Sequence, residues 1–195
     1  MSGYYERALR EFRRLFGQIC KAGVKEPTAV VLATADRAGR PSIRTVLLKG
    51  VDDRGFVFYT NLKSRKGKDL AANPRAALCF YWEPLGMQVI VEGRVKPVSS
   101  EEADAYWKTR PRQSQIGAWV SKQSSPLKNR LVLFSEAARA MTRFAGRPVP
   151  RPSHWSGLRV VPDRIEFWKR KPFRLHERRV YRKRGKRWVF EMLYP

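Results

Sequence analysis

The feature that most constrains the fold is a series of short β-type segments joined by connections of only a few residues. The first three are TAVVLATA (28–35), PSIRTVLLKG (41–50) and FVFYTN (56–61), which contain β-branched or aromatic residues. Turns rich in Asp and Gly, at 36–39 and 52–55, separate them. A parallel crossover needs about a dozen residues or more, so we expect these strands to pair antiparallel as a hairpin and meander.

The pattern continues toward the C-terminus, where further segments have the composition of strands. They are AALCFYW (76–82), MQVIVEGRV (87–95), RIEFWK (164–169), RLHERRVYRK (174–183) and RWVFEMLY (187–194). Helical segments are interspersed among them, and no linker or internal repeat divides the chain. We therefore expect a mainly β fold with α elements (α+β), a single antiparallel barrel over residues 1–195 decorated by helices.

Two segments have the periodicity of amphipathic helices. The segment 6–21 has its apolar residues at three- and four-residue steps: Leu9, Phe12, Leu15, Phe16 and Ile19. The segment 128–144 places another apolar set on one face: Leu131, Phe134, Ala138 and Met141. Both patterns predict helices.

Capping signals predict two shorter helices. One starts at Ser64 and ends at Asn73, before a proline. The other starts at Ser99, which forms a capping box with Glu102, and continues to about Lys108. The proline-rich stretch that follows the last predicted helix is expected to be an extended loop.

The charge of the chain indicates the kind of partner. Its 195 residues include 41 Lys+Arg and 17 Asp+Glu, giving a formal net charge of +24. Such a balance favours polyanionic or phosphorylated partners. A nucleic-acid-binding protein would carry its cations in one stripe with exposed aromatic residues. The excess charge is dispersed instead, over Arg139, Arg143, Arg147, Arg151, Arg182 and Arg184, so we expect only non-specific, salt-dependent affinity for nucleic acid.

Cysteine and histidine usage argues against a metal site or a disulfide scaffold. Cys20 and Cys79 form no C-x-x-C pair, and the sequence has 2 histidines, so no metal site is expected. The first residues are charged and lack the apolar core of a signal peptide. The longest aliphatic run, AVVLA (29–33), is far shorter than a membrane span. We expect a cytoplasmic protein with no membrane partner.

Two neighbouring clusters of cations predict an anion site. Arg44 and Lys49 stand at the two ends of an otherwise apolar strand. Ser64, Arg65 and Lys66 stand at the expected start of a helix, where free N–H groups and the helix dipole attract a phosphate. The alternatives that involve no ligand are charged side chains that reach from the edge of the strand into solvent and a solvated basic turn before the helix.

Two further clusters have the same character. In RLHER (174–178), interpreted as a strand, the first, third and fifth residues share a face and would repel one another without an anion between them. Tyr106, Arg110 and Ser114 recur at four-residue spacing, begin on a helix, and suit a second phosphate clamp. No catalytic triad, carboxylate pair or Gly-rich phosphate loop is present. The residues alone therefore indicate several anion sites and no particular reaction.

These clusters belong to motifs that span nearly the whole chain: EPTAVVLATAD (26–36), RTVLLKGVD (44–52), FVFYTNLKSRKG (56–67), RPRQSQIGAWVSKQSS (110–125) and IEFWKRKPFRLHER (165–178). With these motifs in this order, the chain closely resembles the pyridoxine/pyridoxamine 5′-phosphate oxidase (pyridoxal 5′-phosphate synthase) family. The resemblance implies an FMN-binding split β-barrel that works as a homodimer with FMN at the subunit interface.

The resemblance also implies roles for individual residues. FMN would be held by Arg44, Thr45, Val46, Leu47, Leu48, Lys49, Tyr59, Thr60, Arg65, Lys66, Gln88, Gln123, Ser124, Trp168 and Arg178. The phosphorylated substrate would be held by Lys49, Tyr106, Arg110, Ser114, Arg174 and His176, of which Arg174 and His176 would be catalytic and flank its pyridine ring. The N-terminal helix would occupy 1–25, and 147–195 would form a substrate and dimer segment.

The implied reaction is the oxidation of pyridoxamine 5′-phosphate and pyridoxine 5′-phosphate to pyridoxal 5′-phosphate. FMN would accept a hydride from C4′ of the substrate, and O2 would reoxidise the flavin and give H2O2. The alternative is a related split-barrel flavin oxidase of the phenazine-biosynthesis type, acting on another ring. The chain departs from the family pattern at Met87, Ser156, Lys169 and Met192.

Overall fold

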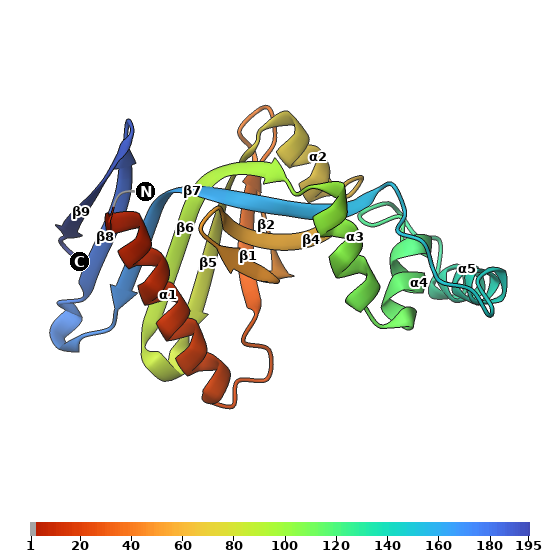
Figure 1. The fold of residues 1–195 in the computed structure, drawn as a ribbon, viewed down its shortest axis with the longest axis horizontal. Coiled ribbons are helices and arrows are strands. Elements are labelled where there is room, and N and C mark those ends of the chain that lie inside the picture. The colour runs from red at the N-terminus through yellow and green to blue at the C-terminus, as the bar shows by residue number, and fades with distance from the viewer. Residues whose placement is uncertain (1–2) are drawn as a thin grey trace.

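The computed structural model describes residues 3–195, so Met1 and Ser2 of the expected N-terminal segment lie outside the described residues. The strands are β1 (Ala29–Ala35), β2 (Pro41–Leu47), β3 (Gly50–Asp52), β4 (Gly55–Asn61), β5 (Arg75–Trp82), β6 (Met87–Pro97), β7 (Trp155–Lys169), β8 (Glu177–Arg184) and β9 (Arg187–Leu193) (Figure 1). The helices are α1 (Gly3–Lys21), α2 (Arg65–Ala72), α3 (Ser100–Thr109), α4 (Arg112–Val120) and α5 (Arg130–Arg143), with short 3₁₀ turns η1 (Glu83–Leu85) and η2 (Pro172–Arg174).

The sheet curls until its two ends approach each other. Its order is β2-β1-β5-β6-β7-β4-β3, with β8 and β9 added beside β7, and the neighbouring strands are antiparallel as expected. β2 and β3 follow each other in the chain yet stand at opposite ends of this order. Between them the Leu48 N–H donates to Thr28 C=O and the Lys49 N–H donates to Val57 C=O, both at 2.8 Å. The prediction of one strand over 41–50 is therefore wrong, because the chain changes pairing partner at this point and leaves a half-barrel.

Helix α1 packs its apolar face into the barrel, and the predicted face is confirmed. Leu9, Phe12, Leu15 and Ile19 are buried, and Phe16 is partly buried. The Phe12 ring centroid lies 4.8 Å from that of Phe56 on β4 and 5.1 Å from that of Phe80 on β5. Burying a phenylalanine side chain contributes about 1.5–3 kcal/mol, so this helix is part of the core.

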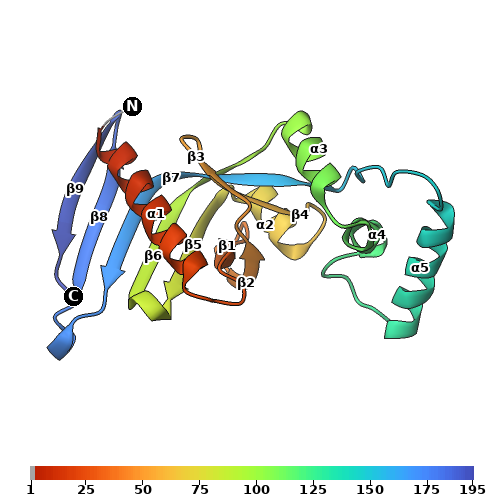
Figure 2. The ribbon, with the colours of Figure 1, turned by 60° about the horizontal axis from the view of Figure 1, so that its bottom comes forward.

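Helices α3, α4 and α5 build a smaller apolar cluster at the far end of the molecule from β8 and β9 (Figures 1 and 2). Trp107 of α3 donates its Nε1–H to the Val149 carbonyl at 2.8 Å, and Trp155 at the start of β7 packs edge-on against its ring. Helix α4 was not expected from the sequence. The apolar face predicted on α5 is exposed at Leu131, Phe134, Ala138 and Met141, because α5 packs on its neighbours through the face that carries Ala140. Within residues 3–195, none of the helices is long and apolar enough to cross a membrane.

The C-terminal strands differ from the prediction at one place. Strand β8 begins at Glu177, three residues later than the strand predicted over 174–183. Before it, Phe173 and Arg174 adopt left-handed backbone conformations, with φ of 56° and 59°. Pro172 cannot donate a backbone hydrogen bond, which favours a turn over a strand here. Arg174 therefore lies in a turn, and strand alternation does not determine where its side chain points.

Candidate active site

A cavity of about 810 Å³ opens where β2 and β4 meet the start of α2 and one face of α4. This volume falls in the range of about 300–1,000 Å³ that is typical of small-molecule and cofactor sites. Most of the residues singled out from the sequence line it: Arg44, Thr45, Val46, Leu47, Lys49, Tyr59, Thr60, Arg65, Lys66, Tyr106, Arg110, Ser114, Gln123 and Ser124. Three of the four clusters of cations therefore share one cavity.

Helix α2 begins as predicted and places a lysine in the cavity wall. Ser64 is the N-cap, and its hydroxyl accepts a hydrogen bond from the Gly67 N–H. A Cβ at Gly67 would lie 2.1 Å from the Leu62 carbonyl oxygen, so the close approach of the helix to the preceding turn requires glycine. These two residues fix the first turn of α2 and, with it, the position of Lys66.

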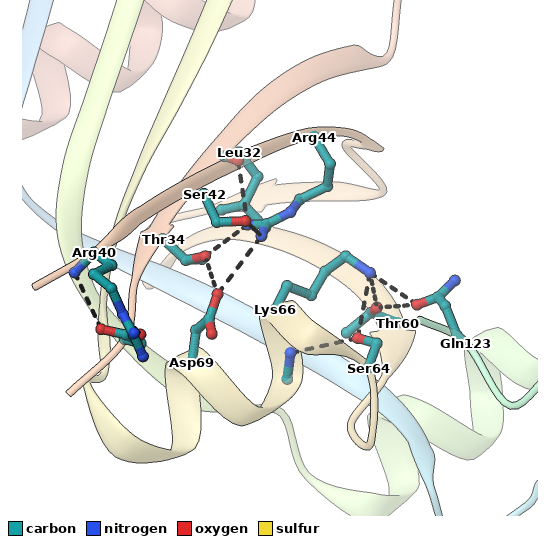
Figure 3. A network of polar contacts seen from close by, with 12 residues as sticks. Leu32, Thr34, Arg40, Ser42, Arg44, Thr60, Ser64, Lys66, Asp69 and Gln123 are labelled. Carbon is teal, nitrogen blue, oxygen red and sulfur yellow. Dashed lines mark hydrogen bonds and ion pairs between the residues drawn. The ribbon is translucent and has the colours of Figure 1, made fainter. Parts of the chain in front are cut away.

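Lys66 is a buried cation surrounded by neutral oxygen atoms (Figure 3). It is 8% exposed, and its Nζ lies 2.8 Å from Gln123 Oε1, 3.2 Å from Thr60 Oγ1 and 3.3 Å from Ser64 Oγ. Burial, and to a lesser extent the charge of Arg44, lower the pKa of Lys66 below its usual 10.5. The apoprotein therefore bears the desolvation cost of this charge, which an anion in the cavity would offset.

Arg44 is held from behind by the hydroxyl groups of two strands (Figure 3). Its Nη1–H donates to Thr34 Oγ1 at 2.7 Å, and its Nη2–H donates to Ser42 Oγ at 2.6 Å. Asp69 of α2 lies 3.6 Å from Nη2 and accepts a hydrogen bond of 2.7 Å from the Thr34 hydroxyl. Burial lowers the pKa of Arg44, with Arg65 adding to the effect and Asp69 opposing it.

The opposite wall carries aromatic rings and one arginine. Tyr59 and Tyr106 stack with centroids 4.0 Å apart, and the Arg110 guanidinium lies 4.8 Å from the Trp155 ring centroid. Arg110 donates to the Ser114 carbonyl at 3.1 Å, whereas its buried Nε has no hydrogen-bond partner in the part of the chain that the structure describes. A buried donor without a partner costs about 1–3 kcal/mol, so this atom indicates a missing acceptor.

Tyr106, Arg110 and Ser114 meet at the cavity, although they do not lie on one helix. Helix α3 ends at Thr109 and α4 begins at Arg112, with Pro111 between them. Pro111 removes a backbone donor and breaks the helix, so the four-residue spacing reflects a sharp turn between two helices. The three side chains line the cavity because of that turn.

The remaining residues form a second cluster outside this cavity. Gln88 on β6 lies opposite Trp168 on β7, and Trp168 lies opposite Arg178 on β8. The His176 ring centroid is 4.6 Å from that of Trp168, and Arg178 Nε donates to buried Glu166 at 2.7 Å. Arg174 lies in the adjacent turn. Leu48, also singled out from the sequence, points its side chain into the barrel core.

One hydrogen bond determines which nitrogen of His176 carries its proton. The Lys171 N–H donates to His176 Nδ1 at 3.2 Å. Nδ1 must then be the acceptor in the neutral ring, which leaves the proton on Nε2. The Nε2–H group is thereby available to donate to a ligand.

Backbone strain coincides with both clusters. Among residues 3–195, the non-glycine residues with positive φ are Ser124, at 70°, and the pair Phe173 and Arg174. Ser124 lines the cavity, and Arg174 belongs to the second cluster. Such conformations cost roughly 1–3 kcal/mol each and concentrate at functional sites.

The residues of the site that were not found from the sequence include Thr34, Ser42, Asp69 and Trp155. For Asp69 a signal existed, because it follows Lys66 by three residues and so falls on the same face of α2. Ser42 lies two residues before Arg44 on β2 and shares its face of the strand, whereas Thr34 reaches Arg44 from β1 through the pairing of the two strands. The hairpin was expected from the sequence, but the register that places Thr34 opposite Ser42 was not.

Known proteins are similar to this sequence over nearly its whole length. Residues 16–143 match the family model described as pyridoxamine 5′-phosphate oxidase, and 155–195 match the one described as the pyridoxine 5′-phosphate oxidase C-terminal dimerisation region. A pyridoxine/pyridoxamine 5′-phosphate oxidase of Myxococcus xanthus is 54% identical over 187 residues, covering 96% of this chain and 91% of its own. One of Alkalilimnicola ehrlichii is 54% identical over 192 residues, covering 97% and 98%. The chain belongs to the pyridoxamine 5′-phosphate oxidase family.

Solved structures confirm the fold expected for a pyridoxamine 5′-phosphate oxidase. PhzG from Burkholderia lata 383, in complex with tetrahydrophenazine-1-carboxylic acid, has a TM-score of 0.91 at 32% identity and covers 100% of this chain and 98% of its own. An FMN-binding protein from Nostoc punctiforme, described as pyridoxamine 5′-phosphate oxidase-related, has a TM-score of 0.76 at 18% identity and covers 95% and 97%. The curled antiparallel sheet with its helices is the split barrel, and the chain is an oxidoreductase of this family.

The cavity and the second cluster of the oxidase fall largely in different family-model regions. The cavity is lined mainly from the first matched region, 16–143. Apart from Gln88, the second cluster lies in the region 155–195, described as a dimerisation region. η2 and β8 stand at the opposite end of the molecule from α4 and α5 in both views (Figures 1 and 2).

Proposed function

We propose that this oxidase binds FMN and oxidises pyridoxamine 5′-phosphate and pyridoxine 5′-phosphate to pyridoxal 5′-phosphate, with O2 as the final acceptor. The observation that carries the proposal is the charge of the cavity. Five of its lining residues are cations, Arg44, Lys49, Arg65, Lys66 and Arg110, and none of those described is Asp or Glu. Such a cavity suits two phosphate groups, one from the cofactor and one from the substrate.

The FMN phosphate is assigned to the start of α2. There the free N–H groups of the first turn and the helix dipole favour an anion. Lys66 and Arg65 lie in this turn, and Arg44 faces it from β2. Thr45–Leu47, Tyr59, Thr60, Gln123 and Ser124 line the rest of the cavity and would contact the remainder of the cofactor. Lys66 fits this role because its charge is buried and, among residues 3–195, makes no hydrogen bond to a carboxylate.

The substrate phosphate is assigned to Lys49, Tyr106, Arg110 and Ser114. The supporting observation is the buried Nε of Arg110, which lacks an acceptor. A phosphate oxygen would supply that acceptor and form a charge-assisted hydrogen bond, about twice as strong as a neutral one. Tyr106 would contact the same phosphate from α3.

The second cluster is assigned to the site of the partner subunit. Trp168, Arg178 and Gln88 of one subunit would complete the FMN site of the other. The match to a dimerisation region supports this arrangement. An exposed apolar face at the cavity supports it as well, because Ile43, which is 71% exposed, and Leu47 both line the cavity. A two-fold dimer uses such a face on both copies and forms two equivalent sites.

In this assignment Arg174 and His176 act on the substrate ring. FMN, when bound, would supply the two-electron chemistry by accepting a hydride from C4′ and passing the electrons to O2, which gives H2O2, and water would hydrolyse the imine formed from the amine substrate to the aldehyde and ammonia. His176 would donate its Nε2–H to a polar atom of the substrate, and Arg174 would hold the ring from the strained turn. The chain thereby orients C4′ and supplies hydrogen bonds and charge.

Oxygen uptake tests the function directly. With added FMN, the protein should consume O2 in the presence of pyridoxamine 5′-phosphate. The specificity constant for unphosphorylated pyridoxamine should be lower by at least about a hundredfold, because two or more charge-assisted hydrogen bonds to the phosphate are missing. Equal specificity constants would refute the phosphate clamp.

A second candidate function follows from the similarity to PhzG. That protein is 32% identical and was solved with a reduced phenazine carboxylic acid. An oxidase of such a ring would use the same flavin site and would not need the clamp at Arg110. Oxygen uptake with a dihydro- or tetrahydrophenazine carboxylate, alongside the pyridoxamine assay, separates the two candidates.

FMN affinity should fall as the pH is raised through the lowered pKa of Lys66. Below that pKa the lysine is charged and attracts the phosphate, and above it the neutral amine does not. Loss of one proton can raise Kd by at most about tenfold per pH unit. Fluorescence titration of FMN at a series of pH values up to 10.5, the usual lysine pKa, would measure the change. Lys66→Arg should remove the dependence, and a parallel decline in that variant would contradict the assignment to Lys66.

A further inference from the structure

A buried carboxylate lies behind the cavity, on the helix that begins the proposed FMN site. Asp69 is 7% exposed and is not among the residues that line the cavity. Its Oδ2 accepts the Thr34 hydroxyl at 2.7 Å and lies 3.6 Å from Arg44 Nη2 (Figure 3). Asp69 therefore contacts Arg44 from outside the main cavity, and it lines a smaller pocket of about 250 Å³ beside Arg65 and Gln123.

The contacts of Arg44 explain what Asp69 can do. The guanidinium donates from Nη1 to Thr34 at 2.7 Å and to the Leu32 carbonyl at 3.4 Å, and from Nη2 to Ser42 at 2.6 Å. These acceptors come from β1 and β2 and hold one edge of the guanidinium against the sheet. Within the described residues its Nε makes no hydrogen bond, so that donor remains for a ligand. The orientation of this free donor depends on the contacts behind it.

Thr34 connects the carboxylate to the arginine. A hydroxyl has one hydrogen atom to donate, and Thr34 donates it to Asp69. Its lone pairs are then directed toward Arg44, which donates to the same oxygen. The carboxylate strengthens this chain because a hydrogen bond to an ionised acceptor is stronger than one to a neutral acceptor. Without Asp69 the hydroxyl is free to rotate, and Arg44 loses its fixed acceptor.

We propose that Asp69 is a positioning residue for phosphate binding: through Thr34 it fixes the Arg44 guanidinium in the orientation that the FMN phosphate requires. The inference rests on the proposed function, in which Arg44 binds FMN. Asp69 also repels a phosphate by its charge. The charge of Arg44, 3.6 Å away, offsets this repulsion, and the proposal requires that the gain from a fixed donor exceed the remainder.

Titration of apoprotein variants with FMN, followed by flavin fluorescence, tests the proposal. Asp69→Ala and Thr34→Val should each raise Kd about tenfold. In an Arg44→Ala background, Asp69→Ala should have no further effect, because its influence passes through Arg44. Asp69→Asn, which keeps an acceptor for Thr34, should retain most of the affinity.

A matched control removes a carboxylate–arginine pair elsewhere. Asp163→Ala breaks a 2.7 Å contact with Arg75 at the surface, away from the cavity, and should leave Kd unchanged. A merely structural role for Asp69 would lower the melting temperature and leave the Kd of the folded protein as in the wild type. Wild-type Kd in both Asp69→Ala and Thr34→Val would overturn the proposal, and Thr34→Val decides it alone should Asp69→Ala not fold.

A second readout does not depend on FMN. In the apoprotein, the Nε–H resonance of Arg44, assigned with Arg44→Lys, should be sharp in the wild type and shifted or broadened in Asp69→Ala. An unchanged resonance would contradict the positioning role. If the wild type binds no FMN, the proposed function fails, and this resonance still decides whether Asp69 positions Arg44.

Discussion

Mixing two inactive variants should restore about a quarter of the wild-type oxidase activity, because each proposed site takes residues from both subunits of a two-fold dimer. Arg65→Ala/Lys66→Ala removes cations from the cavity, and Arg174→Ala/His176→Ala removes the proposed catalytic pair from the second cluster. Each homodimer then has two defective sites. In a mixed dimer both defects fall in one site, and the other site is intact. Random mixing makes half of the dimers mixed, so one site in four is active.

Subunit exchange followed by oxygen uptake with pyridoxamine 5′-phosphate measures this recovery, and native mass spectrometry shows that mixed dimers have formed. The control mixes either variant with a chain that carries all four substitutions, which cannot form an intact site. Verified mixed dimers without activity would mean that the cavity and the second cluster serve different sites. The assignment of Arg174 and His176 to the substrate of the partner subunit would then be wrong.

Lys66→Met should weaken FMN binding by about ten- to a hundredfold, because a charge-assisted hydrogen bond contributes about 1.5–3 kcal/mol. The same change should leave the melting temperature of the apoprotein equal or higher. Lys66 is buried among neutral acceptors, so the folded apoprotein bears a desolvation cost that methionine removes. FMN titration should therefore show weaker binding by the variant, and calorimetry should show no loss of stability.

The matched control is Lys68→Met, which removes an equal charge from an exposed position on the same helix. Its FMN affinity should stay within about twofold of the wild type, since exposed charges interact weakly through water. If Lys66→Met lowered the melting temperature and left FMN affinity unchanged, Lys66 would be a structural residue of α2. The phosphate would then have to bind elsewhere in the cavity.

The parts of the site that could be predicted from the sequence are those with local causes. The start of α2 follows from a capping serine and the basic residues after it, so Arg65 and Lys66 were expected where they lie. The family motifs then supplied most of the other lining residues, including Gln123, which contacts Lys66 from a distant loop. No local rule connects those two positions.

The parts that were wrong or missed depend on distant segments. Arg174 and His176 were expected on a strand, but the left-handed residues before β8 depend on how the chain turns back from β7. Thr34 and Asp69 were missed because their contact brings β1 and α2 together across 35 positions of sequence. Periodicity identifies a buried face and does not identify which polar group it meets.

The pairing of β1 with β2 makes the site sensitive to insertions and deletions in a position-dependent way. Arg44 lies opposite Leu32, and Ser42 lies opposite Thr34, so these four residues share one face of the two strands. Adding one residue within β2 would turn Arg44 to the opposite face, where Ile43 now lies. Adding one in the turn between Ala35 and Pro41 would leave every paired row in place. An insertion or deletion in that turn therefore leaves the Arg44 site in place, whereas one inside the strand disrupts it.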